Sequence, residues 1–215
     1  MGKIVLATII ISGSAKWLLK VGGNKEKWYG SDRIFMYVMT VFGAMAVNYS
    51  EQCTEYGWVV SNLRLLAGCL LAGGLLSAAY MDCRNCWVYN YVWWWCLPWA
   101  GILGMTAGGG FHGIVAVLVF VMLQQLLFSR MYGKADCHAF SVCALAECGN
   151  AVGMVGFLLQ MFLSVVLLTI VQLFRGNVTP RGRLREPQPF IPYIITAFFS
   201  VTFLESVFRT TYIYA

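Results

Sequence analysis

Only three aspartates occur in the 215 residues, and two of them lie at the edges of apolar segments. Asp82 ends one apolar run and Asp136 directly precedes another, whereas Asp32 lies in a polar stretch. Ionisable side chains at membrane depth are costly, which makes them candidates for a functional role. Two carboxylates at one level of a helix bundle can share a proton and hydrolyse a peptide bond. The alternative is that each caps a helix or pairs with Arg84 or Lys134.

The composition is that of a membrane protein. Hydrophobic residues make up 60% of the chain and charged residues 11%, and the mean hydropathy is +0.70. Soluble domains average about 45–50% apolar and about 25% charged residues, so a water-soluble globule and a disordered chain are both excluded. A membrane-spanning helix takes about 20 residues. The length therefore predicts a single all-α domain over 1–215, a polytopic bundle of about eight transmembrane segments with short loops.

Eight apolar runs are the candidate spans, and we expect helices because backbone polar groups in lipid must be paired internally. The runs cover residues 4–19, 34–49, 62–81, 91–107, 112–129, 137–148, 152–174 and 190–208. The sixth is short for a hydrocarbon core of about 30 Å, and we expect it to cross with its start below the membrane surface. The first is similar to a signal peptide, but it continues past Lys16 and is expected to be retained.

Basic residues alternate between the connections that join these runs. They are Lys20, Lys25, Lys27 and Arg33 after the first run, Arg84 after the third, Arg130 and Lys134 after the fifth, and Arg175, Arg181, Arg183 and Arg185 after the seventh. The positive-inside rule puts these connections in the cytoplasm. It predicts a multi-pass protein of the cell membrane with both termini outside and Asp82 and Asp136 on the cytoplasmic side.

The net charge and the sequence motifs indicate which partners and cofactors to expect. The formal net charge of +6 is explained by topology, so no nucleic-acid partner is expected, and the late arginines can hold anionic headgroups of the lipid bilayer. Nothing in the sequence assigns an oligomeric state. HExxH and P-loop patterns do not occur, and we expect no cofactor and no metal.

Small residues recur at four-residue spacing in the third run, as the pairs Gly68/Ala72, Gly73/Ser77 and Gly74/Ala78. This spacing lets helix backbones approach closely, and the packing would fix the position of Asp82 at the end of the run.

Three segments resemble motifs of the type IV prepilin peptidases, in that family's order. Residues 82–90, DCRNCWVYN, resemble its D-x-R-x-x-x-[IV]-P-N segment. Residues 133–136, GKAD, resemble its GxGD motif, and residues 189–194, PFIPYI, its P-F-x-P-F-L segment. The resemblance covers about residues 60–208 and leaves 1–59 as two extra N-terminal helices.

The resemblance implies a GxGD-type intramembrane aspartyl endopeptidase, related also to preflagellin peptidases, that cuts the short basic leader from type IV pilin-like precursors. It implies that Asp82 and Asp136 are the catalytic pair. The supporting or substrate-binding residues that it implies are Arg84, Asn90, Gly133, Lys134, Ala135, Pro189, Phe190 and Pro192. The family's cytoplasmic insertion linked to methylation has no counterpart in this chain, so no methyl transfer is expected.

Four further residues carry chemistry. Cys83 and Cys86 form one CxxC, which without a second CxxC is a weak sign of metal or redox work. His138 lies about 200° around a helix from Asp136, so we expect a structural or lipid-facing role. Glu147 is either an internal hydrogen-bond partner or a residue of the outer interface, and we favour the interface.

Ala135 departs from the GxGD pattern, because the family has a second glycine there and alanine adopts positive φ only at a cost. Three alternatives to the peptidase remain. One is a small transporter or channel whose aspartates bind protons or cations. The others are a presenilin-like or signal-peptide-peptidase-like protease that cuts within a helix span, and a membrane scaffold.

Overall fold

Eight helices make up almost all of the computed structural model, which describes residues 2–22, 30–52, 57–106, 111–126, 129, 133–148, 153–175 and 188–213. In chain order they are α1 (Gly2–Val21), α2 (Gly30–Gln52), α3 (Trp58–Asn85), α4 (Asn90–Thr106), α5 (Phe111–Leu126), α6 (Lys134–Glu147), α7 (Gly153–Phe174) and α8 (Ile191–Ile213). No strand occurs in these ranges. Each predicted run coincides with one helix, which confirms the all-α class.

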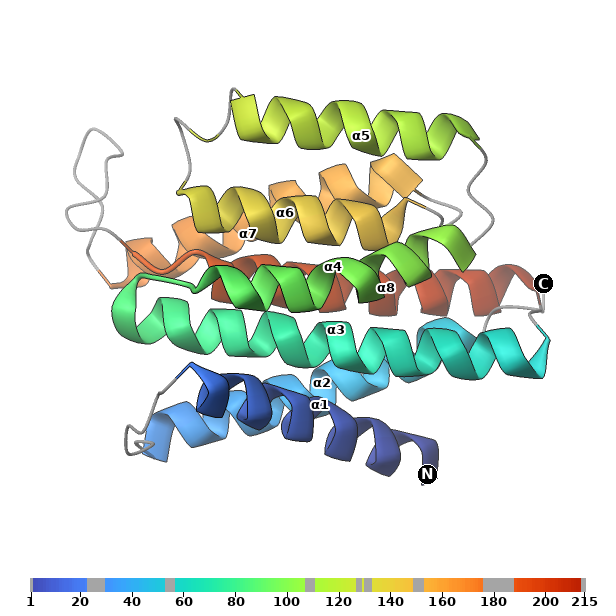
Figure 1. The fold of residues 1–215 in the computed structure, drawn as a ribbon, viewed down its shortest axis with the longest axis horizontal. Helices are drawn as coiled ribbons and strands as arrows, with labels where there is room; N and C mark the ends of the chain where they lie inside the picture. The colour runs from blue at the N-terminus through green and yellow to red at the C-terminus, as the bar shows by residue number, and fades with distance from the viewer. Residues whose placement is uncertain are drawn as a thin grey trace.

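Consecutive helices run in opposite directions, so that α3 ends and α4, α6 and α8 begin at one end of the bundle, at the left of Figure 1. We call this the Asp82 end. Both chain termini lie at the other end (Figure 1). Within the described residues, α1, α3, Val155–Phe174 of α7 and Ile191–Phe208 of α8 are long and apolar enough to cross a membrane.

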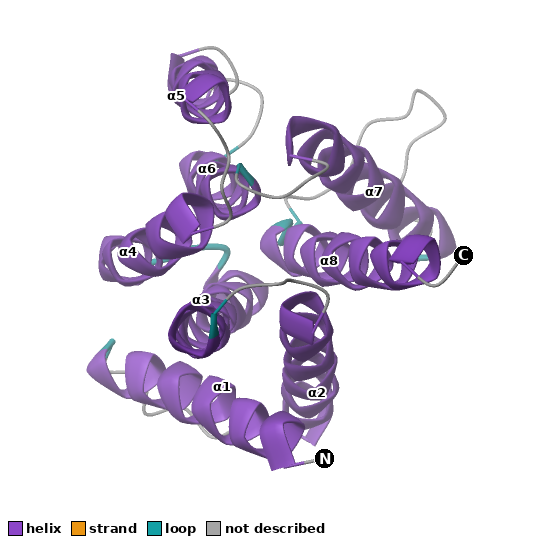
Figure 2. Ribbon diagram, turned by 90° about the vertical axis from the view of Figure 1, so that its right-hand side faces the viewer, coloured by secondary structure: helices purple, strands orange, loops and turns teal. Residues whose placement is uncertain are grey.

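α3 lies at the centre of the arrangement, between α1, α2, α4 and α8 (Figure 2). The predicted small-residue positions each meet a different neighbour. A Cβ atom on Gly68 would meet Val47 of α2, one on Gly73 would meet Ser14 of α1, and one on Gly74 would meet Cys96 of α4. The prediction that small residues pack α3 is therefore confirmed, and the three glycines lie on different faces of α3, each against a different helix.

Hydrogen bonds and aromatic contacts fix the neighbours of α3 along its last turns. The Tyr91 hydroxyl donates to the Leu18 carbonyl at 2.8 Å, which ties α4 to the end of α1. In the adjacent layer, Phe140 of α6 packs edge-on against Phe157 and against Phe190, with ring centroids 6.3 and 5.8 Å apart. The contact with Phe190 sets the middle of α6 against the start of α8, and the contact with Phe157 joins α6 to α7.

The expectation that Glu147 lies at the outer interface is wrong, and the internal alternative is confirmed. Only 2% of Glu147 is exposed, and the Thr202 hydroxyl donates to its Oε1 at 3.3 Å. Eleven residues bring a helix back to nearly the same face, so Glu147 points inward like Asp136, at the opposite end of α6.

We expect Gly73→Ala to destabilise the protein by about 1–3 kcal/mol, because the added methyl group overpacks the α1–α3 contact. Its Cβ would lie 2.9 Å from the backbone carbonyl oxygen of Ile11, which a rotamer change cannot move. Gly101→Ala in α4 is the matched control, since its Cβ would meet nothing within 4 Å. Thermal unfolding in detergent should show a lower midpoint for Gly73→Ala alone, and equal midpoints for both variants would contradict the packing.

Candidate functional site

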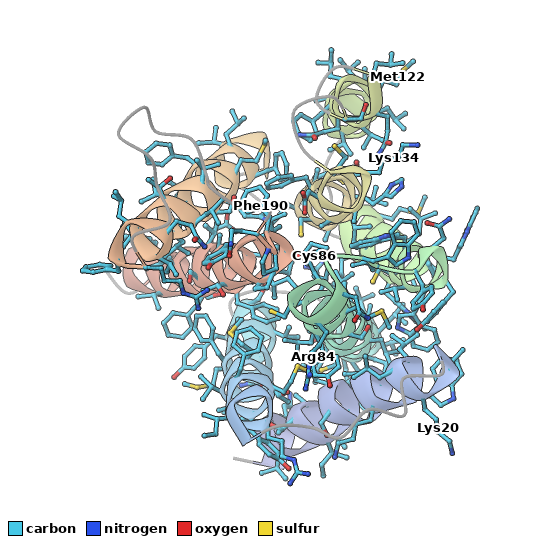
Figure 3. The ribbon with its side chains drawn as sticks, turned by 90° about the vertical axis from the view of Figure 1, so that its left-hand side faces the viewer. Lys20, Arg84, Cys86, Met122, Lys134 and Phe190 are labelled. Carbon is cyan, nitrogen blue, oxygen red and sulfur yellow. The ribbon has the colours of Figure 1, made fainter. Side chains whose placement is uncertain are left out.

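An open cavity of about 850 Å³ lies at the Asp82 end of the bundle. Its lining includes residues of the first two predicted motif segments, together with Gln188 next to the third. Figure 3 looks onto this end and labels Cys86, Lys134 and Phe190, which come from the end of α3, the start of α6 and the residue before α8. Asp82 and Asp136 both line this cavity.

Asp82 lies in the last turn of α3 and is only 6% exposed. Its Oδ2 accepts the backbone N–H of Ile191 at 3.0 Å. Ile191 is the first residue of α8, where backbone N–H groups have no partner within the helix and the helix dipole favours negative charge. The third motif segment therefore contributes a backbone group, because it places the N-terminus of α8 next to Asp82.

Asp136 is the third residue of α6, and its Oδ2 accepts the backbone N–H of Gly133 at 3.1 Å. Gly133 has an ordinary extended conformation, with φ −64° and ψ 153°. Ala135 is helical and needs no positive φ, so it fits this position without the expected cost. What Gly133 contributes is space, because a Cβ atom there would lie 3.1 Å from Asp136 Oδ2.

The two carboxylates interact electrostatically. Burial and the nearby charge of Asp82 raise the pKa of Asp136 to about 7, against the opposing effect of the Gly133 N–H. Interacting carboxylates titrate as a pair, and Asp136 retains its proton up to about neutral pH. The structure thus brings together the two aspartates that the sequence singled out.

The helix-capping alternative holds as well, since Asp136 caps its own helix and Asp82 caps α8. Each of these bonds uses Oδ2, and both carboxylates also face the shared cavity. The other alternative was an ion pair with Arg84 or Lys134. The Arg84 guanidinium lies 5.8 Å from the centre of the Tyr80 ring, and Figure 3 shows Arg84 on the side of α3 away from Lys134.

The other predicted site residues divide into two groups. Asn90, Gly133, Lys134 and Ala135 line the cavity. The cavity lining does not include Arg84, Pro189, Phe190 or Pro192. Phe190 is 6% exposed and packs on Phe140, so its contribution is to hold the start of α8 in place.

The lining also contains six residues that were not predicted as part of the site, namely Cys86, Trp87, Val88, Trp93, His138 and Gln188. His138, for which we expected a structural or lipid-facing role, also lines the cavity. Its ring lies 6.0 Å from that of Trp93 and its Nδ1 is 3.3 Å from Gln125 Nε2. The cavity extends around the start of α6 towards α4, so a residue 200° from Asp136 still reaches it. Trp87 could have been predicted to line the site, because it lies inside the first motif segment.

Cys83 and Cys86 are exposed, and neither forms a disulfide within the described part of the chain. Cys86 ends α3 in the left-handed conformation, with φ 48°, and its N–H donates to the Asp82 carbonyl at 2.9 Å. Within the described residues, no group of three or more His, Cys, Asp or Glu side chains is placed to hold a metal ion.

Comparisons of the chain with protein-family models, with curated proteins and with solved structures found no match. The resemblance to prepilin peptidases therefore rests on the three motif segments alone.

We expect the free energy of unfolding to fall as pH rises from about 4 to about 7, because the folded protein retains a proton on Asp136 that the unfolded chain has lost. A raised carboxyl pKa favours folding at low pH, and this contribution is lost as pH passes the folded value of about 7. Asp136→Asn should flatten the dependence. The check is thermal unfolding in detergent between about pH 4 and pH 8, and an equally steep fall in the variant would contradict the assignment.

Proposed function

We propose that this protein is an intramembrane aspartyl endopeptidase that removes the short basic leader from type IV pilin-like precursors. The observation that carries the proposal is the convergence of Asp82 and Asp136 from two helices in one open cavity. The raised pKa of Asp136 supports it, since a single shared proton is what a pair of catalytic carboxylates needs.

The proposed topology has eight crossings, with the Asp82 end in the cytoplasm and both termini outside the cell membrane. Its support is the alternating direction of the helices together with the charge pattern. Lys20, Arg33, Arg84, Lys134 and Arg175 all lie within a few residues of a helix boundary at the Asp82 end. The positive-inside rule assigns such an end to the cytoplasm.

In the proposed reaction Asp82 is the carboxylate, stabilised by the Ile191 N–H, and Asp136 holds the proton. Asp82 takes a proton from water as the water oxygen bonds to the scissile carbonyl carbon, and Asp136 donates its proton to the carbonyl oxygen. The carbon–nitrogen bond then breaks. The leaving nitrogen takes the proton from Asp82, and a hydroxyl of the diol returns one to Asp136, which restores the starting pair.

The proposed substrate suits the position of the pair. A precursor with a cytoplasmic leader and a membrane helix has its junction at the inner membrane surface, where a helix end is easily unwound. The described lining of the cavity offers Trp87, Trp93 and the cation Lys134, and no acidic residue beyond the aspartates. We therefore propose that the cavity selects the substrate's unwound backbone and apolar helix rather than the charges of its leader.

The test is to co-express the protein with a tagged type IV pilin precursor and to sequence the new N-terminus. The wild-type enzyme should cut after the glycine that ends the leader, and Asp82→Asn and Asp136→Asn should each lose at least about 100-fold in rate. Asp32→Asn, which changes the remaining aspartate, is the control and should cut normally.

Other outcomes would contradict the proposal. Normal processing by either site variant would remove the pair from catalysis. A cut inside the apolar helix would favour a presenilin-like enzyme. Ion flux in liposomes without any peptide product would favour the transporter.

We expect Gly133→Ala to slow cleavage about tenfold without unfolding the protein. The added Cβ crowds Asp136 Oδ2 and displaces the carboxylate by a few tenths of an ångström. Gly57→Ala is a close control, since Gly57 precedes α3 with nearly the same φ and ψ, −55° and 151°, and a Cβ there would meet nothing. Cleavage rates and unfolding midpoints of both variants decide the matter, and an unimpaired Gly133→Ala enzyme would refute the role of this glycine.

A further inference from the structure

A second cavity, of about 270 Å³, lies between α1 and α2, the two helices outside the motif resemblance. α1 is tilted relative to α2 (Figure 2), and its last turns lean towards α4, where Tyr91 donates to the Leu18 carbonyl. The tilt leaves a wedge between α1 and the first half of α2, and the wedge is this cavity.

The wall of the wedge is mostly apolar, with hydroxyl groups from Ser12, Tyr37 and Thr40, and its charged residues are basic. Ala15 and Met36 are buried, with 1% and 6% exposure. Lys16 from α1 and Arg33 from α2 are exposed and line the same cavity. None of the described lining residues is acidic.

Both cations lie at the depth of the membrane surface in the proposed topology. Lys16 precedes the end of α1 by five residues, about 8 Å along the helix, and Arg33 follows the start of α2 by three residues, about 5 Å. A lipid phosphate group lies at this depth, and its acyl chains extend from there into the membrane. Two cations from different helices can bind the phosphate oxygens, and the neighbouring apolar wall can contact an acyl chain.

We propose that this wedge binds an anionic phospholipid, with its phosphate between Lys16 and Arg33 and the start of an acyl chain along Ala15 and Met36. Two adjacent positive charges favour a lipid with net negative charge over a zwitterionic one, whose own ammonium group they would repel. The site is separate from the peptidase cavity, and lipid binding there does not depend on catalysis by Asp82 and Asp136.

The test measures lipid binding by native mass spectrometry of the intact protein in detergent, with phosphatidylglycerol, phosphatidylcholine or inorganic phosphate added. We expect phosphatidylglycerol to bind at least about fivefold more tightly than phosphatidylcholine, and Lys16→Gln and Arg33→Gln each to weaken it about fivefold. Lys20→Gln is the matched control. Lys20 is exposed on the same helix and points away from the bundle (Figure 3), so its change should alter binding less than twofold.

Three results would overturn the proposal. Equal loss in all three variants would indicate diffuse surface attraction instead of a site. Equal binding of the two lipids by the wild-type protein, a comparison that needs no variant, would remove the charge selectivity. Inorganic phosphate that competes as well as the whole lipid would remove the acyl chain from the site.

Discussion

Two carboxylates held close together at a poorly hydrated place cannot both be ionised cheaply, and the rest of the structure depends on this constraint. Burial, together with repulsion by Asp82, raises the pKa of Asp136 to about 7, so that Asp136 keeps a proton up to about neutral pH. Each carboxylate has a backbone N–H that stabilises charge, from Ile191 for Asp82 and from Gly133 for Asp136. Both N–H donors lie at the start of a helix. The positions at which α6 and α8 begin therefore determine how the charges of the two carboxylates are stabilised.

Helix packing sets those positions. The small residues of α3 let three neighbours approach it, which places the last turn of α3, and so Asp82, at the centre of one end of the bundle. The contact between Phe140 and Phe190 holds α6 against the start of α8. The same end carries the basic residues that support the proposed orientation and, between α1 and α2, the wedge lined by Lys16 and Arg33.

Much of the fold and part of the candidate site were predictable from the sequence, for physical reasons. Apolar runs mark helices because lipid leaves the backbone no other partner, and the parity of the runs places Asp82 and Asp136 at one end. Backbone donors such as the Ile191 N–H could not be predicted, because the pattern of side chains does not show which backbone groups will face a carboxylate. The depth of Glu147 and the access of His138 depend on which helices pack beside α6, which hydropathy does not encode.

The most direct measurement of the central claim is infrared spectroscopy of the protonated carboxyl band as a function of pH, in the wild-type protein and in Asp82→Asn. The account predicts a band from Asp136 that titrates near pH 7 in the wild type. It predicts a midpoint at clearly lower pH in the variant, because the neighbouring negative charge is gone while the burial remains. An Asp136 midpoint that does not move when Asp82 is neutralised would show that the two side chains do not share a proton.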